Sequence, residues 1–217
     1  MKRIICTLLI ILCITNILTI TLAVYNWAND RSTFELPDYK EEISYSLDGL
    51  NVSSVGPVEH RKAQRVIDAL HKLGPIAKEQ SKYGVVIVDV SQMPETEAGT
   101  VLTYSADQYY TAGTFQIGSN QIKIADKGNS AGTLYHEMGH YVDFNYLDSN
   151  ATLSNSKTWK TILQNEFKNT SWDLYYTDRR EFFAECFQSY FDNPEWLKQH
   201  CPEAYDFIGD IVVGYEN

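Results

Sequence analysis

The sequence contains His136-Glu137-Met138-Gly139-His140 in a stretch with helical character. Residues 128–130 (Gly-Asn-Ser) offer a helix cap before it, and the helical pattern continues to about Asn145. Side chains four positions apart on an α-helix are turned by about 40° and raised by about 6 Å, so both imidazoles project from one face. Glu137 points obliquely past them, toward a water on a shared metal ion. The motif therefore predicts a helix suited to metal-activated hydrolysis.

The residues around this motif indicate that the helix is buried. Leu134, Tyr135, Met138, Tyr141 and Val142 make much of it apolar. The alternative is a surface helix that carries two unrelated histidines. Buried neutral imidazoles require a partner, so the apolar flanks favour a metal site over that alternative.

Two histidines leave a zinc ion short of a protein ligand, because a catalytic site uses three and keeps one position open for water. Residues 141–147 contain no histidine, so we expect a carboxylate. Asp143 follows His140 on the same helix and is better placed to support the site from outside. The downstream candidates are Glu166, Glu181, Glu185 and Asp192.

The segment Glu181-Phe182-Phe183-Ala184-Glu185 places two carboxylates one helical turn apart, with apolar residues between them. Burying two carboxylates costs several kcal/mol unless a cation or hydrogen-bond donors receive them. One can bind the metal while the other accepts the outer N–H of a ligating imidazole and fixes its tautomer. The alternative is a solvated pair on an amphipathic helix.

Together, the motifs at 136–140 and 181–185 resemble the metallopeptidase domain of anthrax lethal factor and its short secreted relatives, the Pro-Pro endopeptidases. The resemblance covers about residues 113–191. It includes the segment Gly113 to Ile124, which is similar to the strand pair that precedes the zinc helix in those proteins. Cys201-Pro202 is also similar to a dipeptide of the Pro-Pro group.

The resemblance implies a zincin-type fold and a role for each motif residue. His136, His140 and Glu181 would bind Zn²⁺. Glu137 would be the catalytic base, and Glu185 would be a supporting residue close to the ligands. Residues that bind the substrate are not identified by this comparison.

Those families also use a tyrosine shortly before the ligand glutamate, and its hydroxyl can support the oxyanion of the tetrahedral intermediate. This chain departs from the pattern, because Leu174 stands at the usual spacing and is followed by Tyr175 and Tyr176. We expect Tyr175 to take the role in a loop one residue shorter, with Tyr176 as the next candidate. The alternative is that both tyrosines only pack.

The beginning of the chain differs from the rest. Lys2 and Arg3 precede an apolar run to about Val24, which predicts a signal peptide over residues 1–23, or an uncleaved membrane anchor. In both cases the following domain faces the outside. Residues 24–56 are polar and irregular and predict an extended arm. Once the leader is removed, Cys186 and Cys201 remain, either as one disulfide or as buried free thiols.

The remaining chain, residues 57–217, predicts one α+β domain. We expect a helix over 58–73, a strand over 85–88 that is buried on both faces, a loop over 91–112 and a hairpin over 114–124. After the motif helix, helical patterns follow at 156–168, 179–192 and 202–213. The prediction is a small mixed sheet with a hairpin, then the zinc helix, then a mainly helical C-terminal part.

The net charge is -10, with 18 Lys and Arg against 28 Asp and Glu, so a nucleic-acid partner is not expected. The sequence predicts a secreted, monomeric zinc-dependent endopeptidase that acts on peptides or proteins. We expect the substrate to lie extended beside Thr114 to Ile117 as an added strand. One alternative is an endopeptidase restricted to Pro-Pro bonds, although Arg180 stands where those enzymes carry an acidic residue. The other is a secreted zinc-binding protein or toxin component without catalysis.

Overall fold

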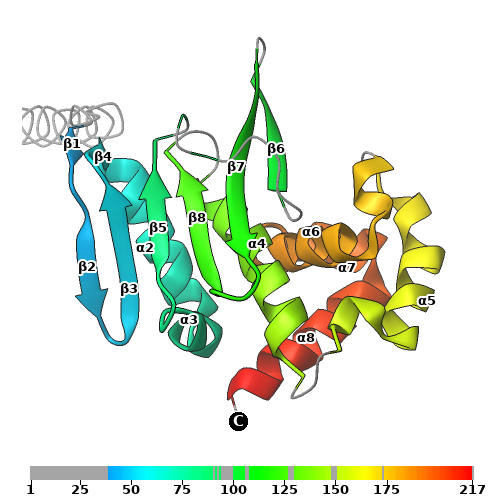
Figure 1. Ribbon diagram of the computed structural model, residues 1–217. Helices are drawn as coiled ribbons and strands as arrows, with labels where there is room; N and C mark the ends of the chain where they lie inside the picture. Colours follow the sequence, from blue (N-terminus) through cyan, green and yellow to red (C-terminus); the bar gives the residue numbers. More distant parts are fainter. Residues whose placement is uncertain are drawn as a thin grey trace, which may run out of the picture. The chain divides into compact units, whose positions relative to one another are not determined.

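A six-stranded mixed sheet forms the frame of the domain (Figure 1). The structure is a computed structural model, and it describes residues 39–216 apart from 90, 92, 94–99, 106–107, 127–129, 148–150 and 173. The strand order in the sheet is β2-β3-β5-β8-β7-β6. The strands are β2 (Ser44–Leu47), β3 (Leu50–Val55), β5 (Val85–Val88), β6 (Thr100–Ser105), β7 (Gln108–Gln116) and β8 (Gln121–Ala125).

The centre of the sheet is parallel and apolar. Strand β5 lies between β3 and β8 and runs parallel to both, with Val85 opposite Val52 on one side and Ile122 on the other. Val85, Ile87 and Val88 are buried. Val86, on the opposite face from Val85 and Ile87, is only partly buried, so the burial expected on both faces is incomplete at this residue. The predicted strand is confirmed.

The predicted hairpin is also confirmed. Strands β7 and β8 pair antiparallel from Gly113 opposite Ile124 to Gln116 opposite Gln121. In the turn between them Gly118 has a φ of 94° and Asn120 a φ of 54°, in the region of positive φ that these two residue types enter at least cost.

The loop predicted over 91–112 is wrong for residues 100–105 and 108–112. Strand β6 pairs antiparallel with β7, which begins at Gln108 rather than at 114, and the register shifts between Val101 and Leu102. The Gln, Ser and Asp residues of this segment are typical of loops, and they weaken the strand pattern of its Thr, Val and Tyr residues. Pairing with a neighbouring strand supplies stability that no local pattern reveals.

The irregular arm predicted over 24–56 is wrong for residues 40–55. Strand β1 (Lys40–Glu41) pairs with β4 (Val58–Glu59), while β2 and β3 join the main sheet. In β3, buried Leu50 and Val52 alternate with exposed or partly exposed polar residues, and this four-residue signal is too short to stand out in a polar segment.

The compact unit that contains this sheet begins at Tyr39 rather than at residue 57. The predicted leader over 1–23 and residues 24–38 of the arm lie outside the described residues. Across the described part of the chain, every helix is too short or too polar to span a bilayer.

Helices α2 and α4 lie behind the sheet in Figure 1 and contact each other. Helix α2 (His60–Leu73) buries Val66 and Leu70 and confirms the prediction over 58–73. Helix α4 (Ser130–Asn145) confirms the predicted motif helix. The other elements are α3 (Pro75–Gln80), α5 (Lys157–Glu166), α6 (Arg179–Asp192), α7 (Pro194–His200), α8 (Pro202–Glu216) and the 3-10 turns η2 (Leu153–Asn155), η3 (Phe167–Asn169) and η4 (Leu174–Thr177).

The helices predicted after the motif are present, and α6 packs against α4. Helices α3 and α7, each one or two turns long, were not predicted. The class of the domain is therefore α+β, as expected. Cys186 and Cys201 are both buried free thiols. Burial, together with the neighbouring Cys201 thiol, raises the pKa of Cys186.

Candidate metal centre

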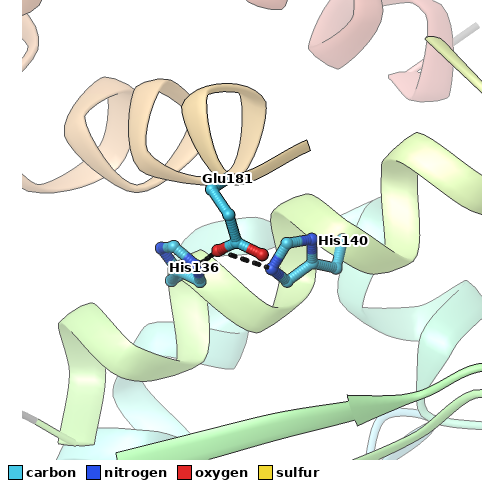
Figure 2. A group of neighbouring side chains, drawn as sticks. All are labelled: His136, His140 and Glu181. Carbon is cyan, nitrogen blue, oxygen red and sulfur yellow. Dashed lines mark hydrogen bonds and ion pairs between the residues drawn. The ribbon is translucent and has the colours of Figure 1, made fainter. Parts of the chain in front are cut away.

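Helix α4 is buried along most of its length, which explains why its motif residues are withdrawn from solvent. Leu134, Met138 and Val142 are fully buried, and the histidines His136 and His140 are no more than 2% exposed. Figure 2 shows both imidazoles pointing from α4 toward the facing helix α6. The separation of four positions thus places both rings on one face, as predicted.

Helix α6 brings the third candidate ligand to this face in its first turn. Asp178 caps the helix by accepting a hydrogen bond from the backbone N–H of Arg180 at 2.8 Å. Glu181 is 4% exposed and points at the two imidazoles (Figure 2). Its Oε2 lies 3.3 Å from Nε2 of His136 and 3.5 Å from Nε2 of His140.

The approach of the two helices depends on Gly139, inside the motif. A Cβ atom at this position would lie 2.8 Å from Cα of Ala184 and 3.0 Å from Cβ of Phe187 on α6. Real Cβ atoms do not make contacts of 2.8 Å with backbone atoms. Only glycine therefore allows α6 to approach closely enough for Glu181 to reach the histidines.

The geometry of these three side chains fits a metal ion. One ligand atom from each of His136, His140 and Glu181 lies within 4.8 Å of the other two. Metal–ligand bonds of 2.0–2.2 Å in a tetrahedron give ligand–ligand distances of about 3.3 to 3.6 Å, which matches the two oxygen–nitrogen distances. Among the described residues, Nε2 of His140 has no hydrogen-bond partner. A buried imidazole nitrogen that makes no hydrogen bond, with a carboxylate oxygen 3.5 Å away, is what a cation would satisfy.

Glu185 lies on the opposite side of His136, one helical turn after Glu181. Its Oε2 is 3.3 Å from Nδ1 of His136, so it can accept the ring N–H and leave Nε2 free to bind an ion. This placement agrees with the supporting role that the sequence suggested for it.

Buried charges shift the pKa values of all three candidate ligands. Burial disfavours protonation of His136, but hydrogen bonds to Glu181 and Glu185 outweigh burial and raise its pKa to about 10. Burial lowers the pKa of His140. Burial acts to raise the pKa of Glu181, yet its contacts with both histidines outweigh this and lower the pKa. One proton and one carboxylate charge thus share the site when no cation is present.

Glu137 is fully buried and lies against strand β7. A Cβ atom at Gly113 would lie 2.9 Å from both Cγ and Oε1 of Glu137, and 2.5 Å from Cγ2 of Thr133. Burial raises the pKa of Glu137 to about 8, while His136 and the backbone of Phe115 act to lower it. Neither carboxylate oxygen has a hydrogen-bond partner among the described residues. The carboxyl group of Glu137 therefore has hydrogen-bonding capacity that no described residue uses, and the close approach of β7 at Gly113 holds its side chain in place.

The two candidate tyrosines lie in η4, directly before α6. The ring of Tyr176 is 6.5 Å from the ring of His136, measured between centroids. The side chain of Tyr175, the residue chosen from the sequence, lies outside the described part of the structure. Its role as oxyanion donor stays a prediction, and Tyr176 is the tyrosine seen beside a candidate ligand.

The other carboxylates considered from the sequence have different partners. Asp143 accepts hydrogen bonds from the backbone N–H and the hydroxyl of Ser154 at 2.6 and 2.7 Å. Glu166 accepts from the backbone N–H groups of Glu203 and Ala204, at the start of α8. Of the candidates, Glu181 alone joins the histidines in the described metal-ligand group.

Sequence reasoning did not single out Gly139 or Gly113 as site residues. A glycine inside an amphipathic helix or a strand is itself a signal of close backbone approach, because it otherwise costs stability. What approaches each glycine, however, is visible only once the helices and the sheet are placed.

A buried His-His-Glu group on two packed helices, with a buried glutamate beside it, defines an α+β protein with a candidate metal-binding site. A family model described as "Anthrax toxin lethal factor, N- and C-terminal domain" matches residues 99–211, just over half of the chain. The chain therefore belongs to the anthrax lethal factor family. A search of curated proteins finds no match to this sequence.

Proposed function

We propose that this protein is a secreted, zinc-dependent endopeptidase with a zincin-type fold. The observation that carries the proposal is the convergence of His136, His140 and Glu181 on one point, with Glu137 buried next to them. Three ligands leave one position of a tetrahedral ion open, which is the arrangement of catalytic rather than structural zinc. Membership of the lethal factor family supports the same conclusion.

When bound, zinc would act as a Lewis acid that lowers the pKa of a water molecule and polarises the substrate carbonyl. Glu137 would accept a proton from the attacking water and later deliver it to the leaving amine. The positive charge of a cation on the three ligands would bring the pKa of Glu137 down from about 8, toward the value that suits a base at neutral pH. Glu185 would keep the ring of His136 in the tautomer that presents Nε2.

The hydroxyl of Tyr175, or of Tyr176, would donate a hydrogen bond to the oxyanion of the tetrahedral intermediate. Tyr176 has the better support because its ring lies beside His136.

The strand pairing bears on one residue, Thr114, of the substrate position expected over Thr114 to Ile117. A peptide cannot add as a strand at Thr114, because Thr100 of β6 already pairs there and Lys123 of β8 pairs on the other side. In the six-stranded sheet, β6 is the outer strand beyond β7, and β7 contacts the motif helix. We therefore place the extended substrate along β6, where backbone hydrogen bonds would hold it and side-chain pockets would set preference.

The test uses purified protein, a peptide library that includes Pro-Pro sequences, and zinc measured by elemental analysis. We expect cleavage that a chelator abolishes, and loss of cleavage in Glu137→Gln by about 100-fold or more with zinc content unchanged. Glu195→Gln, an exposed change on α7, is the matched control and should behave as wild type. Wild-type protein that binds one zinc ion but cuts no peptide would support the non-catalytic alternative. Cleavage confined to Pro-Pro bonds would support the narrow specificity.

Secretion is a separate part of the proposal. It rests on the apolar segment before residue 24. Amino-terminal sequencing of protein recovered from the medium should show a start near residue 24. Recovery of the uncut chain from membranes would instead indicate an anchor.

A further inference from the structure

The two helices that carry the candidate ligands are also connected through a third helix, α5. At one end of this connection is Asp143, which lies on α4 one turn after His140. The Asp143 carboxylate accepts hydrogen bonds from the backbone N–H and the hydroxyl of Ser154 at 2.6 and 2.7 Å. Both residues are fully buried. Two residues later, Ser156 caps α5 by accepting a hydrogen bond from the backbone N–H of Trp159.

At the other end of the connection is the indole of Trp159. Its Nε1–H donates to the backbone carbonyl of Arg179 at 2.9 Å. Arg179 is the first residue of α6 and stands two residues before Glu181. The Trp159 side chain is fully buried, and its ring packs 5.4 Å from that of Phe182 and 4.9 Å from that of Phe183.

This pair of contacts places the start of α6 relative to α4. The first turn of a helix is where backbone hydrogen bonds are fewest and fraying begins. Glu181 lies in that turn, and a metal site needs its ligands held to within about 0.5 Å. The contact at Gly139 fixes the middle of α6 near Ala184, and Phe191 of α6 stacks on Tyr135 of α4 at the far end of the helix. The hydrogen bond from Trp159 to the carbonyl of Arg179 holds the first turn, where Glu181 lies.

We propose that Trp159 is a positioning residue for the metal site: its indole N–H, anchored to α4 through Ser154 and Asp143, holds the first turn of α6 so that Glu181 is in place before an ion binds. This inference rests on the proposed zinc site. A large apolar residue would fill the same core space, but only an indole provides a donor directed at the backbone beside the ligand. Trp159→Phe separates the two roles, because it keeps a buried ring and removes the donor.

The experiment measures zinc affinity of the full chain by competition with a chromophoric chelator, and hydrogen exchange of the zinc-free protein. We expect Trp159→Phe to bind zinc about five- to tenfold more weakly, the loss typical of one buried hydrogen bond, and to exchange amides of residues 180–183 faster. The matched control is Phe207→Leu on α8, whose ring lies 5.4 Å from that of Trp159. It should lower the melting temperature without changing zinc affinity.

Ser154→Ala tests the other end of the connection and serves if Trp159→Phe does not fold. It removes the hydroxyl bond to Asp143 and leaves the backbone bond, so a two- to fivefold weaker affinity is expected. Affinity within twofold of wild type in the variants that fold would overturn the positioning role and leave the proposed function intact. A wild-type protein that binds no zinc would overturn the proposed function itself.

Discussion

Replacing Gly139 with alanine should damage the metal site far more than it damages the fold. The new Cβ would lie 2.8 Å from Cα of Ala184, whereas carbon atoms pack at about 3.5 to 4.0 Å. Helices α4 and α6 would have to move apart by about 1 Å. The distances from Glu181 to the two histidine nitrogens, now 3.3 and 3.5 Å, would grow to about 4.4 Å, beyond the span of a tetrahedral zinc site.

The effect on stability should be smaller because two terms oppose each other. Overpacking costs about 1 to 3 kcal/mol, while alanine in place of glycine favours a helix by about 1 kcal/mol. We therefore expect the zinc-free variant to lose about 0 to 2 kcal/mol, and its zinc affinity to fall at least tenfold. The assay is competition with a chromophoric chelator, together with chemical unfolding of the zinc-free protein.

Gly209→Ala on α8 is the matched control. Its Cβ would lie 3.6 Å from the hydroxyl oxygen of Tyr190, an ordinary contact, so stability should rise by up to about 1 kcal/mol and zinc affinity should not change. Zinc affinity of Gly139→Ala within twofold of wild type would refute the reasoning, since it would mean that α6 does not need this close approach.

Three further predictions concern the chemistry of the site. Gly113→Ala should push Glu137 aside, because the new Cβ would lie 2.9 Å from its Oε1. The variant should have a kcat lower by about tenfold or more, while its zinc content stays near one ion. An unchanged kcat would contradict the idea that Gly113 keeps Glu137 in position. Zinc binding should release at least one proton at pH 7, because the raised pKa of His136, about 10, keeps its ring protonated until the ion displaces the proton. Zinc affinity should therefore rise by up to tenfold per pH unit from pH 7 to 9. Calorimetry in buffers of different ionisation enthalpy measures the number of protons released. If no proton is released, His136 is neutral before zinc binds. Tyr176→Phe should lower kcat with little change in KM, and the same result for Tyr175→Phe alone would restore the choice made from the sequence.

The helices of this domain could be predicted because their patterns are local. Helix α2 repeats apolar residues at helical spacing and stops at Gly74-Pro75, and the sequence before the motif helix contains residues that favour a helix cap. The strands were less visible. Strand β3 pairs with β5, which is distant in the sequence, and β6 pairs with β7, the strand that follows it. The polar residues of both strands read as loop until this pairing is known.

The part of the candidate site that could be predicted follows from the free-energy cost of burying charged side chains. Glu181 and Glu185 stand among phenylalanines, so their carboxylates were expected to contact a cation and an imidazole. The structure places both carboxylates against His136. The contacts of Gly139 with α6 and of Trp159 with Arg179 could not be foreseen, because they depend on how three helices pack.

The burial of α4 has a consequence for how long the protein persists. An enclosed cluster of imidazoles and carboxylates is costly to fold around without a cation, so an ion that binds only the native form adds its binding free energy to folding. In the zinc enzyme that we propose, scarcity of zinc would then do more than stop turnover. It would raise the fraction of opened chains, and neighbouring proteases would clear them, so trace-metal supply would set how long the molecule persists as well as how fast it works.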